Sequence, residues 1–167
     1  GVVLAVELDL DAGGWSGEVA YAQLASALQV QLGERVPLAD ARRAVLALRA
    51  SKGMVLDPAD PDSVSAGSFF TNPILDTADV PPGAPAWPVG DGRVKTSAAW
   101  LIEHAGFGRG YRIGPVGLST KHTLALVNHG GASTSDLVSF ARLIRNGVRE
   151  AFGVTLEVEP ALVGVSL

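Results

Sequence analysis

The sequence has 167 residues, which suits one domain, or one domain with part of a neighbouring one. Apolar residues make up 47% and charged residues 18%, values typical of a globular chain and not of a disordered one. The net charge of −4, without any basic cluster, argues against a nucleic-acid partner. Cysteine is absent, which excludes disulfides and thiolate metal sites and suits a cytoplasmic protein. No apolar run approaches the roughly 20 residues of a membrane span, so no membrane partner is expected.

The chain begins directly on a segment in which apolar and polar residues alternate. From Leu4 to Leu10 the even positions are aliphatic, a period of two that predicts a half-buried β-strand over residues 2–10. The only methionine is Met54, in the interior, whereas a natural chain starts with methionine and some lead-in. We therefore expect this sequence to be a piece of a longer protein.

Two helices are predicted next, from apolar spacing and from the glycines that follow them. One is expected at 21–32 before Gly33 and a stronger one at 39–52 before Gly53, because glycine favours the left-handed residue that ends many helices. A stiff polar loop with two prolines follows at 57–62.

Proline and glycine dominate the middle of the chain. Four prolines in residues 81–92 predict a surface loop, and a short helix is expected at 97–105. Five glycines make residues 106–117 irregular, and a strand is predicted at 123–128.

The strongest helical pattern comes last. Apolar residues recur at helical spacing from Leu137 to Phe152, and Ser133 with Asp136 is typical of a capping box. A strand is predicted after it, at 154–159. Because strands and helices mix without a regular strand–helix–strand order, the sequence predicts an α+β fold, a mixed sheet with helices packed on it.

The sequence carries no recognisable local motif for FAD, NAD or a metal. Gly106 and Gly108 would need a third glycine at position 111 to form a dinucleotide fingerprint, and Tyr111 stands there. The sequence contains no phosphate-binding loop, no nucleophile elbow and no zinc-binding HExxH helix. The three histidines lack metal-ligand spacing, so no metal site is predicted.

Several blocks in this order carry a resemblance to a known family. The most specific is Ala-Gly-Ser-Phe-Phe-Thr-Asn-Pro at 66–73, and the others are Arg-x-x-Lys at 49–52, VKTSAAWLIE at 94–103, STKHT at 119–123 with Asn128, and LEVEPALVG at 156–164. Over nearly its whole length the chain resembles the UDP-N-acetylenolpyruvoylglucosamine reductases, flavoenzymes of peptidoglycan precursor synthesis.

The resemblance implies a reaction and a division of the chain. The family reduces the enolpyruvyl ether of UDP-N-acetylglucosamine to UDP-N-acetylmuramate in the cytoplasm, with NADPH as reductant and FAD as the hydride carrier. Residues 1–36 would be the last strand of the FAD-binding domain and a connector, and residues 37–167 the C-terminal substrate-binding domain. The FAD-binding half would precede residue 1, so the fragment is expected to bind the UDP-sugar without catalysing the reaction alone.

The resemblance also implies two catalytic residues. The family's proton-donating serine maps onto Ser68 and its closing glutamate onto Glu159, with Glu157 as the competitor for that role. A serine hydroxyl is a weak acid, so it donates a proton only to a strongly basic carbon in an arranged site. Without the resemblance, Ser68 reads as a turn serine bonded to its own backbone.

Five further residues map onto substrate contacts of the family. Lys52 and Lys95 map onto lysines that meet the diphosphate and the carboxylate, and Asn72 maps onto an asparagine of the serine block. Tyr21 maps onto a tyrosine that folds over the nucleotide, and His122 onto a polar contact. For each lysine the alternative is an ordinary solvated charge.

Three other functions remain open at this point. The first is a UDP-sugar-binding module without chemistry. The second is a serine hydrolase that uses Ser68 and His122, for which the elbow motif is missing. The third is an interaction domain built on the helix at 135–152, although core packing also explains its amphipathic pattern.

Overall fold

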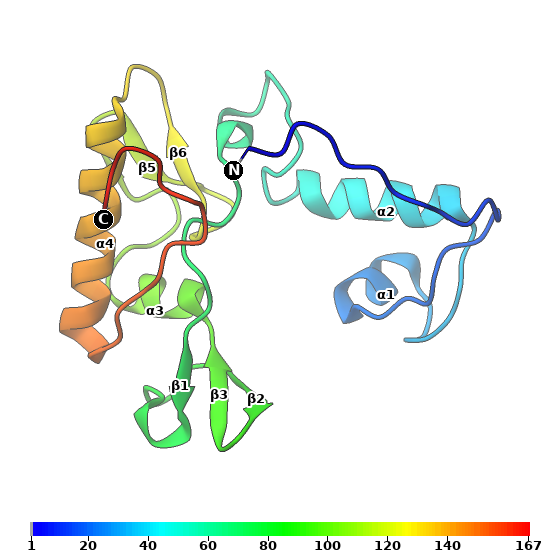
Figure 1. Cartoon of the computed structure of the whole chain (residues 1–167), viewed down its shortest axis with the longest axis horizontal. Helices are drawn as coiled ribbons and strands as arrows, with labels where there is room; N and C mark the ends of the chain where they lie inside the picture. The colour runs from blue at the N-terminus through cyan, green and yellow to red at the C-terminus, as the bar shows by residue number, and fades with distance from the viewer. Residues whose placement is uncertain (1) are drawn as a thin grey trace. The chain divides into compact units, whose positions relative to one another are not determined.

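The structure, a computed structural model, describes residues 2–167 (Figure 1). The chain forms two compact units, a first one that ends at Arg49 and a second one over Ala50–Leu167. The larger part of the buried apolar core lies in the second unit.

The first unit contains two helices and a short antiparallel pairing of backbone. The pairing joins residues 14–19 to residues 33–38. Between these segments lies α1 (Ala22–Leu28), and α2 (Leu38–Ala50) follows them. Both predicted helices are present, but α1 is shorter than expected because Gln29, with a φ of 57°, ends it in the left-handed conformation.

The predicted strand over residues 2–10 is wrong for this structure. These residues lie outside every strand and helix, and the side chains of Leu4, Val6, Leu8 and Leu10 are 72–93% exposed. A strand exists only where a neighbouring backbone pairs with it, and none of the described residues pairs with this segment. An alternating pattern predicts which face a strand would bury, but not whether a partner is present.

The second unit contains two three-stranded antiparallel sheets, whose strand orders are β1-β3-β2 and β4-β5-β6. The strands are β1 (Ile74–Asp76), β2 (Ala86–Gly90), β3 (Arg93–Thr96), β4 (Arg112–Ile113), β5 (Val116–Leu118) and β6 (Leu126–Asn128). The α+β class is confirmed, with two small antiparallel sheets where one mixed sheet was expected.

Two helices, α3 (Ala98–His104) and α4 (Thr134–Phe152), pack against each other, and α4 also contacts β5 and β6 (Figure 1). The predicted capping box of α4 is confirmed, since Ser133 and Asp136 each accept a backbone N–H of the other. Short 3₁₀ turns, η1 (Pro61–Val64) and η2 (Thr77–Asp79), complete the unit.

Three sequence predictions need correction in the second unit. The proline-rich stretch is not all loop, because β2 runs through Pro88 at the edge of its sheet, where a missing N–H interrupts no ladder. The strand expected at 123–128 begins only at Leu126. The segment 154–159 forms a single bridge, Phe70 with Val158, and is not a regular strand.

Phe70 lies at the centre of the core of the second unit. Its side chain is fully buried, together with Leu101 and Ile102 of α3, Leu118 of β5 and Ile144 of α4.

No helix within residues 2–167 is long and apolar enough to cross a bilayer.

Candidate functional site

Ser68 begins an extended segment that is held on both edges by backbone hydrogen bonds. On one edge it bridges Ala125, and the N–H of Phe69 donates to the carbonyl of Leu124 at 2.7 Å. On the other edge, the N–H of Glu159 donates to the carbonyl of Phe69 at 2.9 Å. Because Phe70, two residues further on, is fully buried, the backbone of the half-buried Ser68 is firmly placed.

Gly67 sets the direction from which the chain enters this segment. Its φ of +86° lies in the left-handed region, where a residue with a Cβ is strained. The backbone geometry therefore requires a glycine at position 67. Its conformation sets the direction in which the chain enters Ser68.

The same pairing gives the backbone positions of the two candidate glutamates along the serine segment. Glu159 stands opposite Phe69, the immediate neighbour of Ser68, whereas the carbonyl of Glu157 accepts the N–H of Thr71, three residues from Ser68. The structure thus brings the backbone of Glu159 closer to Ser68 than that of Glu157, which supports the assignment of Glu159.

His122 lies in the turn that leads to the other edge of the serine segment. Its carbonyl accepts the N–H of Ala125 at 3.0 Å, and its Nδ1 accepts the N–H of Leu124 at 3.3 Å. Since Nδ1 is an acceptor, the neutral ring carries its proton on Nε2 and presents that N–H as a donor.

Electrostatics favour this neutral form. Burial lowers the pKa of His122 below its usual 6.5, the positive charges of Lys52 and Arg109 lower it further, and the carboxylate of Glu103 acts in the opposite direction. At neutral pH the imidazole is therefore suited to donate a hydrogen bond to a ligand oxygen and not to carry a charge.

Sequence reasoning missed Arg109. Its Nε lies 3.6 Å from Oε1 of Glu103, which also accepts the hydroxyl of Thr123 at 3.3 Å. Together with Lys52 and Arg109, the N–H of His122 makes the surroundings of this turn suitable for an anion such as a phosphate or carboxylate. The only signal in the sequence was its position as one of two arginines within the glycine-rich stretch.

Asn72 has a structural bond that the sequence did not reveal. Its Oδ1 accepts the N–H of Ala98 at 2.9 Å, next to Ser97, whose hydroxyl accepts the N–H of Trp100. Asn72 thus joins the serine segment to the first turn of α3, and its amide nitrogen and the second lone pair of Oδ1 remain for the predicted substrate contact.

The two remaining candidates lie elsewhere. Lys95 is on β3, on an exposed face beside its cross-strand neighbours Ile74 and Trp87. Tyr21 belongs to the first unit, where it is 76% exposed and lines a shallow cavity of about 350 Å³ between α1 and α2. Within the second unit, backbone pairing brings Ser68 near Glu159 and the turn of His122, and Lys52 acts electrostatically on His122.

A larger open cavity, of about 790 Å³, adjoins this group without reaching Ser68. Its lining includes Thr71, Asn72 and Glu157 together with the chain that follows α4. Among residues 2–167, no group of three or more histidine and carboxylate side chains is placed to hold a metal ion. The candidate site is therefore defined by contacts around Ser68 and not by this hollow.

Comparison with known proteins adds a family to this geometry. Residues 58–163 match the family described as UDP-N-acetylenolpyruvoylglucosamine reductase, C-terminal domain. Proteins named UDP-N-acetylenolpyruvoylglucosamine reductase are 57% identical in Thermobifida fusca, over 99% of this chain and 50% of that protein, and 53% identical in Cutibacterium acnes, over 99% and 45%. The chain thus spans about half the length of the curated relatives it matches.

Among solved structures, that of a UDP-N-acetylenolpyruvylglucosamine reductase from Thermus caldophilus is 29% identical to this chain. The match covers 77% of this chain and 36% of that one, with a TM-score of 0.42.

Proposed function

The chain belongs to the family of UDP-N-acetylenolpyruvoylglucosamine reductases, as their C-terminal domain, and we propose that it forms the substrate-binding half of such a reductase. The whole enzyme would reduce the enolpyruvyl ether of UDP-N-acetylglucosamine to UDP-N-acetylmuramate, a cytoplasmic step of peptidoglycan synthesis. The observation that carries this proposal is the pairing that sets the backbone of Glu159 beside Ser68 and the turn of His122 on the other edge.

We propose Ser68 as the proton donor. Reduced FAD would supply the hydride to the vinyl carbon, and negative charge would then develop on the adjacent carbon, beside the substrate carboxylate. That carbon is basic enough to take the proton of a serine hydroxyl held close to it. Glu159, one position away across the pairing, would stabilise or protonate the enol-like intermediate.

We propose Lys52 and His122 as contacts for the anionic groups of the substrate, with Lys95, Asn72 and Tyr21 completing the binding surface in the whole enzyme. Support differs among them. Lys52 and His122 are close enough that the lysine charge lowers the histidine pKa, while Asn72 already uses one acceptor site of Oδ1 in its bond to Ala98.

In the second unit, the starts of α3 and α4 do not fit the diphosphate of a flavin. The start of α4 is filled by Ser133 and the carboxylate of Asp136, and that of α3 by the oxygens of Ser97 and Asn72. A helix start binds a phosphate through unfilled backbone N–H groups. We therefore propose that FAD, and NADPH when it reduces FAD, are bound mainly by the other half of the whole enzyme.

Two of the alternative functions lose support from the geometry. A hydrolase would need His122 to accept the proton of Ser68, but the neutral ring holds its proton on Nε2 because Nδ1 accepts the N–H of Leu124. An interaction surface on α4 is disfavoured because its apolar residues, among them Phe140 and Ile144, are buried in the core.

A UDP-sugar-binding module without chemistry remains the second candidate, since the cationic surroundings of His122 would suit an anionic ligand in a reductase and in a binding module alike.

The deciding experiment uses the full-length reductase carrying Ser68→Ala, with the two half-reactions followed separately by flavin absorbance. Reduction of the flavin by NADPH needs no proton from Ser68, so its rate should stay unchanged. Reoxidation by the enolpyruvyl substrate should slow by about 10²–10⁴-fold, roughly 3–5 kcal/mol of barrier.

The matched control is Ser65→Ala, which removes a hydroxyl three residues earlier that only accepts the N–H of Gly67 at 3.4 Å. It should leave both half-reactions at the wild-type rate. Reoxidation at the wild-type rate in Ser68→Ala would reduce Ser68 to a structural residue and favour the binding module.

A further inference from the structure

Asp62 is the one buried acidic side chain among residues 2–167, with an exposed fraction of 2%. Its Oδ2 accepts both the N–H and the hydroxyl of Thr120, at 3.0 and 2.5 Å. Its Oδ1 is buried without a hydrogen-bond partner in the described part of the chain. Burying a carboxylate costs free energy of folding, so Asp62 must do something that an apolar side chain at this position would not do.

The backbone of Gly53 lies directly against Asp62. A Cβ at position 53 would stand 3.2 Å from the Cβ and from the carbonyl oxygen of Asp62, and the φ of Gly53 is +68°. The close approach therefore requires glycine, and it presses the turn that carries Lys52 onto the aspartate.

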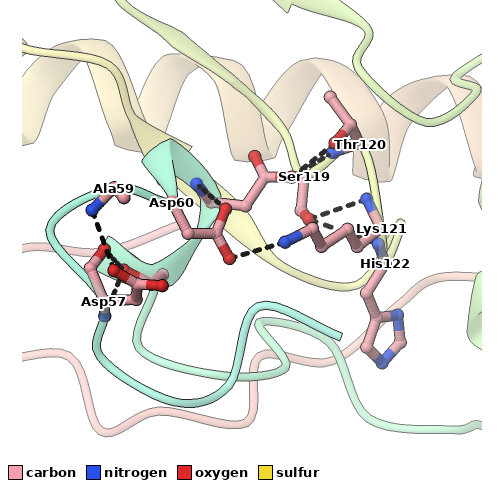
Figure 2. A network of polar contacts seen from close by, with 9 residues as sticks. Asp57, Ala59, Asp60, Ser119, Thr120, Lys121 and His122 are labelled. Carbon is pink, nitrogen blue, oxygen red and sulfur yellow. Dashed lines mark hydrogen bonds and ion pairs between the residues drawn. The ribbon is translucent and has the colours of Figure 1, made fainter. Parts of the chain in front are cut away.

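Thr120, which bonds to Asp62, begins the turn that carries His122 (Figure 2). Thr120 is followed by Lys121 and His122, whose N–H groups both donate to the fully buried hydroxyl of Ser119, at 3.0 and 3.3 Å. The ammonium of Lys121 also pairs with Asp60 at 2.6 Å, while the imidazole of His122 points away from this network (Figure 2).

We propose that Asp62 is a positioning residue that joins the turn of Lys52 to the turn of His122 and so sets the spacing of these two substrate contacts. The role of the two side chains rests on the proposed function, whereas the joining of the two turns does not. Asp62 touches no reacting atom in this assignment. It acts through Gly53 on one side and through Thr120 on the other.

The consequence is measurable on His122 itself. The groups that act on its charge are Lys52 and Arg109, which oppose protonation together with burial, and Glu103, which favours it. If the bonds from Thr120 to Asp62 are lost, the turn loosens and His122 gains contact with solvent and distance from Lys52. Its pKa should then rise toward the usual 6.5.

The test is an NMR titration of the imidazole signals of the 167-residue chain carrying Asp62→Ala. Deleting a nearby negative charge without any movement would lower the pKa of His122. A rise in that pKa has the opposite sign and therefore reports a change of geometry.

The matched control is Asp57→Ala, which removes the same charge from the same loop. The Asp57 side chain accepts the N–H of Ala59 and serves only its own loop, so His122 should not show an upward shift in this variant.

Two milder variants keep the test decisive if Asp62→Ala does not fold. Thr120→Val removes the hydroxyl from the other end of the contact, while the backbone N–H of Thr120 still donates to Asp62, so it should raise the pKa of His122 by a smaller amount. Asp62→Asn keeps one oxygen as acceptor and should restore most of the wild-type titration. An unchanged or lowered pKa in both Thr120→Val and the folded Asp62→Ala, or an equal rise in Asp57→Ala, overturns the proposal. If only Thr120→Val is folded, its result decides.

The full-length reductase then separates this proposal from the proposed function. Asp62→Ala should raise the KM for the enolpyruvyl substrate by about tenfold, as is common when a residue that orients a binding group is lost. Flavin reduction by NADPH should stay at the wild-type rate. A wild-type protein that turns over no enolpyruvyl substrate defeats the proposed function, whereas an unchanged KM in an active Asp62→Ala protein defeats the role of Asp62 in binding.

Discussion

The two units of this chain differ in how many of their large apolar side chains are buried. In the second unit, Phe70 and Ile144 are fully buried and belong to one continuous core. In the first unit, Leu8 is 72% and Trp15 63% exposed, and α2 has no fully buried residue. Both regions are rich in apolar residues, so composition does not explain the difference. It teaches that an apolar pattern becomes a core only where tertiary partners surround it.

The largest test of this comparison is a pair of truncations to alanine. Phe70→Ala should lower the free energy of unfolding of the second unit by about 3–5 kcal/mol, because it removes a ring from the centre of a packed core and leaves a cavity. Leu8→Ala in the first unit should change the free energy of unfolding by no more than about 0.5 kcal/mol, since the Leu8 side chain is mostly exposed. Urea denaturation followed by far-UV circular dichroism measures both. Equal losses from the two variants would show that residues 2–10 are packed after all.

A second pair compares glycines. A Cβ at Gly147 of α4 would stand 2.5 Å from the ring of Phe107, which is itself buried. Overpacking costs about 1–3 kcal/mol, and the better helix propensity of alanine offsets part of it, so Gly147→Ala should destabilise by about 1–2 kcal/mol.

Gly13→Ala is the control in the first unit, because nothing lies within 4 Å of its added Cβ. The change in stability should stay within about 0.5 kcal/mol. Denaturant midpoints at equal m-value give both numbers. A neutral Gly147→Ala would mean that Phe107 moves aside easily and that the core is looser there than its burial indicates.

The smallest expected effect concerns the starts of helices. Ser133→Ala removes the side-chain cap of α4 and should cost about 1 kcal/mol. Tyr21 occupies the same position before α1 but makes no side-chain cap bond, so Tyr21→Ala should cost almost nothing. Thermal unfolding of the two variants measures the contrast.

The same cap predicts a dependence on pH. Hydrogen bonds from Ser133 hold the pKa of Asp136 below its usual 3.8. A carboxyl whose pKa is depressed in the folded state stabilises the fold above the usual value, and this contribution is lost as the pH falls through the folded pKa. Ser133→Ala should therefore lose less stability than the wild type between pH 4 and pH 2. Identical acid profiles would argue against the carboxylate in the cap.

Local signals predicted the helices well and the strands poorly. The start of α4 was readable from Ser133 and Asp136 because a capping box lies within four residues of sequence. The strand at 154–159 was misread because its pairing with Phe70 depends on a segment more than eighty residues away. Pro88 looked like a loop residue because nothing local shows that β2 is an edge strand.

The candidate site divides along the same line. Ser68, Glu159, Lys52 and His122 were predicted from short motifs and their resemblance to a family, without any knowledge of where they meet. Arg109 and Asp62 were missed because a lone arginine and a loop aspartate look like surface charges in sequence. Asn72 was predicted to bind substrate, and its bond to Ala98 of α3 became visible only in the structure.

The sequence by itself determined the α+β class, the positions of α2, α3 and α4, and the family. These depend on apolar spacing, caps and motifs, all of which lie close together along the chain. Only the tertiary structure shows that the backbone of Glu159 pairs with Phe69 and that of Glu157 with Thr71, and that His122 is half-buried and affected by the charge of Lys52. It alone also shows that Asp62 contacts both Gly53 and Thr120. The physical reason is that register, burial and electrostatic coupling are set by segments distant in sequence, which the order of residues does not place in space.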